Sequence, residues 1–258
     1  MSLRFGPVDF DEVARAVAGV PFMSPAQGRI VYDHVRATRP TWALELGTAH
    51  GVGAAYIAAA LPPGGRLITV DHAGAAYDPP PEHVLARAGV RDRVDVVRAH
   101  SSYTWWLKGE LARDEPRLDF AYLDGAKNWT IDGLAVLLLE RVLRPGGWLL
   151  MDDLHWTYAD DPGREVTDGV TVRALSGAER AEPHLRAVFD LLVAGNPAWT
   201  DLRVQDDWWG WARRRRDDEA AGPQRLRVET TRSVGALAAT GLRRAARSAR
   251  RRARALRV

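Results

Sequence analysis

Five short apolar segments, each followed by glycine or polar residues, limit this chain to a small set of folds. Segments with a helical spacing of apolar residues separate them, and this alternation predicts a parallel sheet that helices cover. The predicted strands cover residues 42–46, 67–70, 94–97, 118–123 and 148–151, and the predicted helices cover residues 53–61, 81–88, 103–112 and 130–143. The sequence therefore predicts a doubly wound α/β fold.

The residues after the fifth strand predict how the sheet is completed. A long connection over residues 155–180 precedes a helical pattern near residues 181–194 and two apolar runs, 202–204 and 208–212. We expect these runs to form an antiparallel pair that closes the sheet. The tryptophans at 208–211 are candidates for an interface between copies of the chain, which we expect to form a homodimer or larger assembly.

Composition is consistent with one α/β domain. Of the 258 residues, 46% are hydrophobic, which is enough for one substantial core. The absence of cysteine excludes disulfides, thiolate metal sites and cysteine nucleophiles. The N-terminal residues lack an apolar stretch of signal-peptide length, and no run of about 18 apolar residues occurs. We therefore expect a cytoplasmic protein without a transmembrane segment.

Charge divides the chain into two unlike parts. The net charge is +3, but residues 232–258 contain nine arginines and no acidic residue, so residues 1–231 carry −6. Apolar residues recur in this segment at helical spacing, mostly opposite the arginines. Such a helix could lie on an anionic membrane or a polyanion, or pack weakly on its own domain or a second subunit. We place the main domain at residues 1–216 and a basic tail, helical or partly disordered, at 217–258.

A glycine-rich segment follows the first predicted strand and opens a helix. Its glycines, Gly47, Gly51 and Gly53, would let the backbone approach a ligand, and the helix N-terminus favours a carboxylate or phosphate. The spacing is neither that of a dinucleotide-binding motif nor that of a P-loop. Asp71 ends the second strand, where a carboxylate can accept hydrogen bonds from both hydroxyls of a ribose. The alternative is a tight turn with a capping aspartate.

Three aspartates follow two other predicted strands. Asp124 ends the fourth strand, and Asp152 and Asp153 end the fifth, so that mutual repulsion would favour a bound cation. Oxygen ligands without cysteine suit Mg²⁺ or Mn²⁺. The alternative is that Asp152 caps the next segment and Asp153 faces solvent. Three acids on one edge lead us to predict a metal site formed by Asp124, Asp152 and Asp153.

Lys127 is one of only two lysines in a chain with 36 basic residues of the lysine and arginine types. Lysine can lose its proton at accessible pH, whereas arginine cannot. A cation nearby would lower the pKa of Lys127, so it could act as a base near neutral pH. His155 is a second candidate for this role or a hydrogen-bonding partner of the site.

These motifs together resemble class I S-adenosylmethionine (SAM)-dependent methyltransferases, within roughly residues 25–215. The residues that carry the resemblance are 44–53 (LELGTAHGVG), Asp71, 119–127 (DFAYLDGAK) and 143–153 (LRPGGWLLMDD). The nearest branch is the metal-dependent O-methyltransferases of the catechol and caffeoyl-coenzyme A type and related sugar O-methyltransferases. The resemblance implies a seven-stranded, Rossmann-like, mostly parallel sheet with an antiparallel strand near its C-terminal end, and an N-terminal helical cap.

The resemblance also implies roles for individual residues. The cofactor is SAM, with Mg²⁺ or Mn²⁺ beside it, and Lys127 occupies the position of the family's base. Many sugar-directed relatives have histidine at that position, so this chain follows the catechol-type pattern. The implied cofactor-binding residues are Glu45, Gly47, Thr48, Gly53, Asp71, His100, Ser101 and Asp124.

The acceptor is the least determined part of the reaction. Aromatic rings stack on sugars and on flat aromatic molecules alike, and Trp129, Trp156 and Tyr158 flank the predicted site. Acidic residues of the segment 157–169 offer hydrogen bonds to a polyhydroxy acceptor: Asp160, Asp161, Glu165 and Asp168. Our hypothesis is O-methylation of a saccharide hydroxyl in polysaccharide or natural-product biosynthesis, with a catechol or other phenol as the alternative.

A nucleic-acid-binding or nucleic-acid-modifying protein, recruited by the basic tail, is an alternative of a different class. The charge of −6 on residues 1–231 would repel phosphates. The segment 77–81 (YDPPP) follows the second strand, whereas the similar motif of amino-methylating enzymes follows the fourth and ends in an aromatic residue. The O-methyltransferase hypothesis therefore explains more of the sequence.

Overall fold

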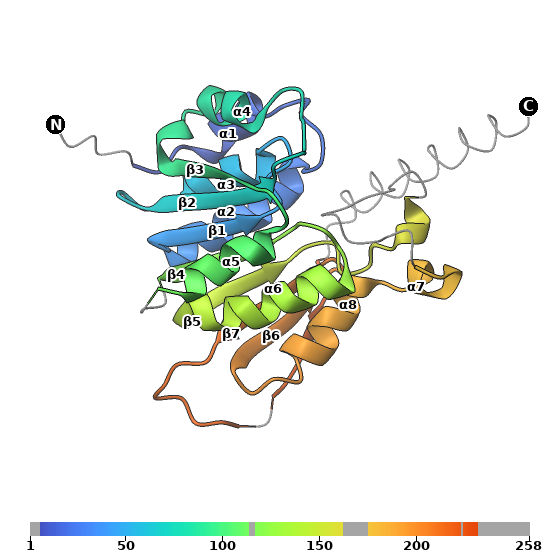
Figure 1. The fold of residues 1–258 in the computed structure, drawn as a ribbon. Coiled ribbons are helices and arrows are strands. Elements are labelled where there is room, and N and C mark those ends of the chain that lie inside the picture. Colours follow the sequence, from blue (N-terminus) through green and yellow to red (C-terminus); the bar gives the residue numbers. More distant parts are fainter. Residues whose placement is uncertain (1–5, 114–116, 162–174, 223, 232–258) are drawn as a thin grey trace, which may run out of the picture.

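The predicted strands form one twisted sheet with helices on both faces (Figure 1). The computed structural model describes residues 6–113, 117–161, 175–222 and 224–231. The strands are β1 (Trp42–Leu46), β2 (Arg66–His72), β3 (Val94–Ala99), β4 (Leu118–Leu123), β5 (Leu143–Met151), β6 (Trp199–Gln205), β7 (Trp209–Arg214) and β8 (Arg227–Glu229). Their order in the sheet is β3-β2-β1-β4-β5-β7-β6-β8.

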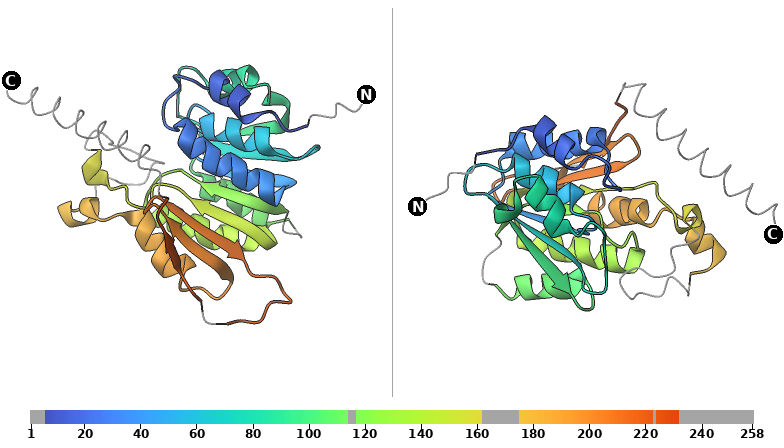
Figure 2. Two further views of the ribbon diagram at one scale, coloured as in Figure 1. Left: turned by 180° about the vertical axis from the view of Figure 1, so that it is seen from behind. Right: turned by 90° about the horizontal axis from the view of Figure 1, so that it is seen from above.

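Helices of two groups cover the two faces. One face carries α1 (Phe10–Ala16), α2 (Pro25–Thr38), α3 (Val52–Ala60) and α4 (Pro81–Arg87), whose apolar residues form one core cluster with the sheet (Figure 2). The other face carries α5 (Tyr103–Leu111), α6 (Trp129–Val142), α8 (His184–Val188) and the π-helix η4 (Phe189–Val193). Shorter helices are η1 (Arg91–Arg93), η2 (Tyr158–Asp160) and α7 (Gly177–Ala181). The predicted α/β architecture is confirmed.

Strand directions confirm the mostly parallel sheet with an antiparallel strand near its C-terminal end. β7 runs antiparallel to both of its neighbours, β5 and β6. The other neighbouring pairs are parallel. β6 and β8 therefore point in the same direction as β1 to β5, and the carboxyl ends of all seven lie at one edge of the sheet.

The predicted count of seven strands is wrong, because the described residues already form a sheet of eight. The additional strand β8 pairs with β6 over Arg203–Gln205. It lies within the segment 217–258 that we assigned to the tail, so the sheet extends past residue 216. Residues 232–258, for which the sequence predicts a helix, lie outside the described residues.

Local sequence signals explain where helices begin and end. Ser24 accepts a hydrogen bond from the amide of Gln27 at 3.3 Å, and Gln27 accepts one from the amide of Ser24 at 2.9 Å, which forms a capping box before Pro25. The helix predicted near residues 181–194 is divided, because α7 ends at Ala181 and Pro183 precedes α8. Proline has no amide hydrogen with which to continue a helix.

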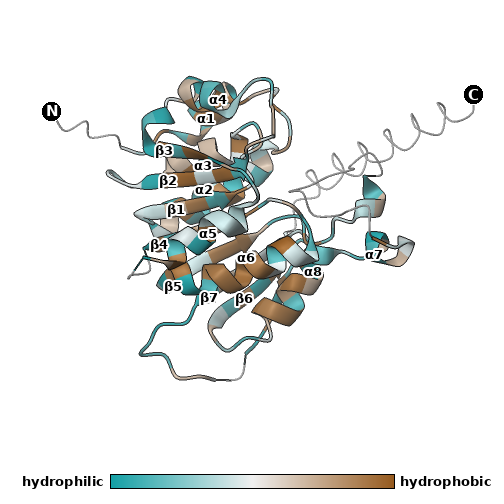
Figure 3. Ribbon diagram, in the orientation of Figure 1, coloured by the Kyte–Doolittle hydropathy of each residue, from teal (hydrophilic) through white to brown (hydrophobic). Residues whose placement is uncertain are grey.

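Most tryptophans of the C-terminal strands are in the core. Trp199, Trp209 and Trp211 are almost completely buried. Trp209 and Trp211 therefore stabilise the sheet and offer little surface to a second copy, and the predicted oligomer stays a prediction. Figure 3 shows that hydrophobic residues also concentrate along α6 and the sheet strands. No helix of the described ranges has the length and apolar character needed to cross a membrane.

Asp119 holds the amino ends of β1, β4 and β5 together. Its Oδ2 accepts hydrogen bonds from the Thr41 amide and hydroxyl, at 2.9 and 2.7 Å, and from the Trp42 amide at 2.9 Å. Its Oδ1 accepts one from Arg144 at 2.9 Å. Burial alone would raise the pKa of Asp119, but these hydrogen bonds and the Arg144 charge hold it below the ordinary value of 3.8.

The substitution Asp119→Asn should lower the free energy of unfolding by about 1–2 kcal/mol at pH 7, because charged hydrogen bonds from β4 to its two neighbouring strands are weakened. Because the pKa of Asp119 is depressed in the folded state, its ionised carboxylate stabilises the fold above the unfolded-state pKa near 4. This stabilisation is lost as the pH falls through the folded-state pKa. The difference between the variant and the wild type should therefore shrink at pH 3, as measured by urea unfolding.

Asp33→Asn is the matched control, because Asp33 forms only an exposed ion pair with Arg29 at 3.7 Å. It should change the free energy of unfolding by less than about 0.5 kcal/mol. A loss for Asp119→Asn that is as large at pH 3 as at pH 7 would contradict the proposed role of its charge.

Candidate functional site

Hydrogen bonding continues past the ends of the central strands and brings their following residues together. The Gly47 amide donates to Val70 O at 2.9 Å, the Asp124 amide to Leu46 O at 2.9 Å, and the Asp152 amide to Leu123 O at 3.0 Å. The glycine loop after β1 and the aspartates after β4 and β5 thus lie side by side. This is the edge at which the sequence predicts ligand binding.

Two glycines of this loop are required by close contacts. Gly47 has φ +103°, and a Cβ at this position would lie 2.3 Å from the carbonyl oxygen of Asp124. A Cβ on Gly53 would lie 2.4 Å from Oε1 of Glu45. A side chain at either position would displace its neighbours, so the loop is packed directly against Asp124 and Glu45.

Glu45 lies beneath the loop in a chain of hydrogen bonds. The Thr69 hydroxyl donates to Glu45 Oε2 at 2.5 Å, and the hydroxyl oxygens of Thr48 and Thr69 are 2.6 Å apart. Burial raises the pKa of Glu45 well above its ordinary value; the Thr69 hydrogen bond opposes this, and the charges of Asp124 and Asp71 add to it. Sequence reasoning missed Thr69, although a polar residue inside the apolar strand 67–70 is a signal.

Asp71 fixes the loop from the neighbouring strand. Its Oδ2 accepts a hydrogen bond from the Ala49 amide at 2.8 Å, and its Oδ1 accepts one from the His72 amide at 2.7 Å. Each carboxylate oxygen can accept a further hydrogen bond, so a ribose can still be bound. His100 and Ser101 follow β3 at the same edge and are exposed. Their predicted cofactor contacts stay predictions.

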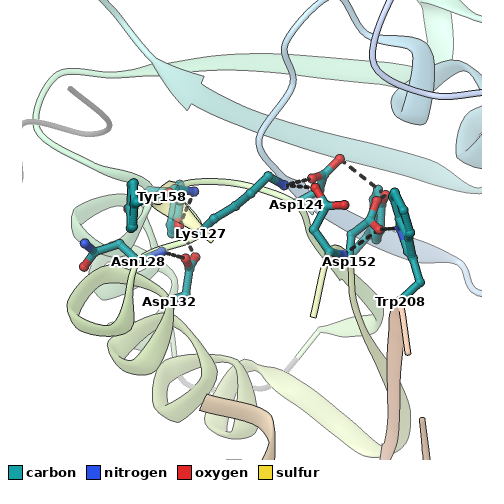
Figure 4. Close-up of polar contacts among 11 residues, drawn as sticks. Asp124, Lys127, Asn128, Asp132, Asp152, Tyr158 and Trp208 are labelled. Atoms are coloured by element: carbon teal, nitrogen blue, oxygen red, sulfur yellow. Dashed lines mark hydrogen bonds and ion pairs between the residues drawn. The ribbon is translucent and has the colours of Figure 1, made fainter. Parts of the chain in front are cut away.

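Lys127 pairs with two of the three aspartates, and Figure 4 shows its side chain directed at Asp124. Its Nζ is 2.6 Å from Asp124 Oδ1 and 2.7 Å from Asp153 Oδ2. Lys127 and Asp153 both have left-handed backbone conformations, with φ of +58° and +57°. Such conformations are uncommon for residues with a Cβ and often occur where a site fixes a side chain.

The pKa values of this group reflect a local excess of negative charge. Burial alone would lower the pKa of Lys127, but Asp124, Asp153 and Asp152 raise it well above its ordinary value. Burial raises the pKa of Asp124; Lys127 opposes this shift and Asp153 adds to it. These carboxylates favour the protonated form of Lys127, and its role as a base stays a prediction.

Asp152 is directed away from Lys127, toward two aromatic donors that sequence reasoning missed. The Tyr122 hydroxyl and the Trp208 indole nitrogen both donate hydrogen bonds to its carboxylate. Burial raises the pKa of Asp152 well above its ordinary value, and Asp124 and Asp153 raise it further. Tyr122 stands two residues before Asp124 in a strand and so shares its face, which is a usable signal. No local signal identifies Trp208.

His155, the second candidate base, packs on Trp208. Their ring centroids are 4.5 Å apart, and His155 is half-buried. The structure thus places His155 near Asp152 through a shared neighbour. Its catalytic role stays a prediction.

A buried network supports the loop that carries Lys127. The Ala126 amide donates to the Tyr103 hydroxyl at 3.1 Å, and this hydroxyl donates to Asp132. Asp132 also accepts a hydrogen bond from the Asn128 amide at 2.7 Å. The Tyr158 hydroxyl donates to Ala126 O at 3.2 Å (Figure 4). These hydrogen bonds hold the backbone of Ala126 and Asn128, on either side of Lys127, in place.

The predicted acceptor-binding aromatics differ in accessibility. Tyr158 is completely buried and offers no surface to an acceptor in this structure, because it supports the loop. Trp129 is 40% exposed at the start of α6, and Trp156 is half-buried with its ring against Tyr158. Asp160 is exposed and Asp161 half-buried near this point, whereas Glu165 and Asp168 lie outside the described residues.

The carboxylate oxygens at this edge of the sheet suit a hard cation, although their arrangement in this structure does not surround one. Within the described ranges, no group of three or more histidine, aspartate or glutamate side chains is close enough to hold a metal ion. Lys127 pairs with Asp124 and Asp153, and Asp152 accepts a hydrogen bond from Tyr122. One ammonium cannot neutralise three carboxylates, so their chemistry still fits an additional divalent cation.

Parts of the chain are similar to known methyltransferases. Residues 44–154 match a family described as "Methyltransferase domain". Catechol O-methyltransferase of Mus musculus is 34% identical over 132 residues, which cover 50% of this chain and 48% of that protein. The transmembrane O-methyltransferase of Homo sapiens is 49% identical over 49 residues, 19% of this chain and 17% of that protein. The chain thus spans about half or less of the length of these relatives.

Solved structures share the fold over most of the chain. The O-methyltransferase from Bacillus cereus in complex with SAH has a TM-score of 0.57 and 22% identity, and covers 81% of this chain and 92% of its own. TomG from Streptomyces achromogenes, involved in tomaymycin synthesis and solved with SAM, has a TM-score of 0.55 and 21% identity, and covers 83% and 92%. The predicted fold is thus confirmed, and residues 44–154 are similar to a methyltransferase domain.

Substitution of Lys127 tests the charge balance of the site. Lys127→Met should lower the free energy of unfolding by about 2–4 kcal/mol at pH 7, because two partly buried carboxylates lose their cation. The pKa of Asp124 in the folded state should rise further, and keeping Asp124 ionised at a pH above this pKa destabilises the fold. The loss of unfolding free energy should therefore shrink as the pH falls through the folded-state pKa of Asp124. Urea unfolding at several pH values measures this.

Lys108→Met provides the control, since Lys108 is the only other lysine and lies at the surface of α5 over the Trp105 ring. Its effect should stay within about 1 kcal/mol. Equal effects of the two substitutions would show that the Lys127 contacts do not matter for stability.

Proposed function

We propose that this chain, which carries a methyltransferase domain in a class I O-methyltransferase fold, is a SAM-dependent and divalent-metal-dependent O-methyltransferase of a small hydroxyl acceptor. One observation carries the proposal: the glycine loop is packed against Asp124, which pairs with Lys127 at the same edge. Cofactor and acceptor would therefore meet beside the charged cluster. The SAH and SAM named for the solved neighbours support the choice of cofactor.

The cofactor would lie on the glycine loop, at the N-terminus of α3. That helix end attracts the carboxylate of the cofactor, and Asp71 can accept hydrogen bonds from its ribose. Glu45 and Thr48 would hold the loop in place through Thr69. The remaining predicted contacts are with Gly47, Gly53, His100, Ser101 and Asp124. The acidic edge also favours the positive sulfonium group.

Asp124, Asp152 and Asp153 would hold Mg²⁺ or Mn²⁺. A bound divalent cation supplies positive charge that makes an acceptor hydroxyl more acidic. The same charge would offset the carboxylates that now raise the pKa of Lys127. Lys127 could then take the proton of the acceptor hydroxyl at Nζ, with His155 as the alternative base.

Two acceptor classes have support from different observations. The names of the relatives, and a lysine three residues after Asp124, favour a catechol or similar phenol. A saccharide, our first hypothesis from the sequence, is supported by the exposed ring of Trp129, which offers a stacking surface beside the site. Both classes can present two neighbouring oxygens to a cation. We propose the catechol type first because residues 44–154 match methyltransferases and the relatives share its name.

Calorimetric titration of SAM and then Mg²⁺ into this chain of 258 residues tests the cofactor and metal. We expect both to bind, and Asp124→Asn to weaken Mg²⁺ binding at least tenfold, on the order of 1.4 kcal/mol, because a ligand carboxylate becomes neutral. Asp95→Asn, which removes a carboxylate from the opposite edge of the sheet, should leave both affinities unchanged. SAM binding without Mg²⁺ binding would remove the metal from the proposal.

A panel of catechols and saccharides, with S-adenosylhomocysteine release as readout, tests the acceptor. We expect turnover of acceptors with two neighbouring hydroxyls and at least a hundredfold loss of kcat in Lys127→Met, as is typical when a general base is removed. Turnover of saccharides alone would reverse the order of the two classes. Full activity of Lys127→Met would assign the base to another residue.

A further inference from the structure

A tight turn between β6 and β7 fixes the position of Trp208. Asp206 and Asp207 form this turn with φ of +56° and +52°. Positive φ at both residues is typical of the two-residue turn whose twist matches that of a β-hairpin. The Trp208 amide donates a hydrogen bond to Gln205 O at 3.0 Å, which closes the turn. Trp208 is therefore held directly before the first residue of β7.

Side chains from two other parts of the chain contact this turn. Arg186 of α8 pairs with Asp207, with Nη1 and Oδ1 3.0 Å apart. The hydroxyl of Thr231, after β8, donates a hydrogen bond to Asp206 Oδ2 at 2.6 Å. Exposed contacts of this kind stabilise little by themselves. The backbone hydrogen bonds of the hairpin therefore provide most of the restraint on Trp208, and these contacts add to it.

Trp208 contacts the residues that follow β5 in three ways. Its carbonyl oxygen accepts a hydrogen bond from the Leu154 amide at 3.0 Å. Its indole N–H donates to Asp152 Oδ1, and Figure 4 shows these two side chains in contact. Its ring packs on His155, with ring centroids 4.5 Å apart. One residue of the hairpin therefore contacts both a predicted metal ligand and a candidate base.

The hydrogen bonds at Asp152 leave unequal capacity on its two oxygens. Oδ1 accepts the Trp208 indole N–H and also the Asp153 amide, the latter at 2.7 Å. Oδ2 accepts the Tyr122 hydroxyl and no other donor of the described residues. A carboxylate oxygen can accept two hydrogen bonds, so Oδ1 is saturated and Oδ2 can take one more partner. The indole thus leaves Oδ2 as the oxygen of Asp152 that can bind a further group.

Two other indole groups of the same strand pair have different surroundings. Trp211 Nε1 donates to Gln205 Oε1 at 3.1 Å. Trp199 Nε1 is buried and has no hydrogen-bond partner among the described residues. The hairpin thus directs the indole of Trp208 to the candidate site, and the indole of Trp211 offers a comparison that forms a hydrogen bond away from it.

We propose that Trp208 is a positioning residue of the candidate cation site, whose indole N–H holds Asp152 so that Oδ2 can bind a divalent cation. A group that donates to a metal-ligating side chain fixes the orientation of that ligand, and its loss weakens metal binding by roughly 10- to 100-fold. This inference rests on the proposed function, because it concerns the same carboxylates. It adds to that function a role for the C-terminal hairpin, in which Trp208 lies 56 residues from Asp152 along the chain.

Calorimetric titration of Mg²⁺ into Trp208→Phe tests the proposal, because phenylalanine keeps an aromatic ring beside His155 but has no N–H. We expect Mg²⁺ to bind at least tenfold more weakly than to the unsubstituted chain, and SAM to bind equally well to both. Trp211→Phe is the matched control, since it also removes an indole hydrogen bond of the hairpin, and it should leave the Mg²⁺ affinity unchanged. Unchanged Mg²⁺ affinity in Trp208→Phe, equal weakening in both variants, or a parallel loss of SAM binding would overturn the proposal.

Magnetic resonance of the indole N–H groups in isotope-labelled protein gives a second measurement. Trp208→Phe and Trp211→Phe identify the signals of these two residues, because each signal disappears in its own variant. Saturating Mg²⁺ should shift the Trp208 signal, since the acceptor of its hydrogen bond binds the cation, and leave the Trp211 signal in place. Mg²⁺ binding without a shift at Trp208 would contradict the positioning role alone, whereas no Mg²⁺ binding to the unsubstituted chain would overturn the proposed metal dependence as well.

Discussion

The ion pairs of Lys127 with Asp124 and Asp153 are the interaction on which the candidate site depends. Three partly or fully buried carboxylates at one edge of a sheet repel one another, and a single ammonium offsets only part of that repulsion. Burial and this repulsion raise the pKa values of Asp124 and Asp152. The site is therefore electrostatically suited to take up more positive charge, which a sulfonium cofactor and a divalent cation would supply.

The residues around this cluster hold it in place without adding charge. Tyr122 and Trp208 donate hydrogen bonds to Asp152, and Tyr103 and Tyr158 fix the backbone of Ala126 next to Lys127. Neutral donors of this kind satisfy buried acceptors at a lower desolvation cost than further ions would require. The aromatic residues near the site thus serve mainly to position it, which explains why Tyr158 is buried.

The same edge combines the glycine loop, the charged cluster around Lys127 and the end of β8. This convergence follows from strand direction, since every parallel strand delivers its following residues to the same side. The C-terminal strand β8 also ends at this edge, because it runs parallel to β6 and ends beside Asp206. One sheet therefore brings sequence-distant features into a common surface.

The sequence by itself determined the α/β class, the five parallel strands, and the gathering of Gly47, Asp71, Asp124 and Asp152 at one edge, because apolar periodicity and the residues after each strand are local signals. It also determined that Lys127 lies beside Asp124, three residues away. Only the tertiary structure decided that β8 joins the sheet, that Trp208 and Thr69 contact site residues, and that Trp209 and Trp211 are core. These depend on contacts between residues far apart in the chain, whose geometry no local pattern encodes.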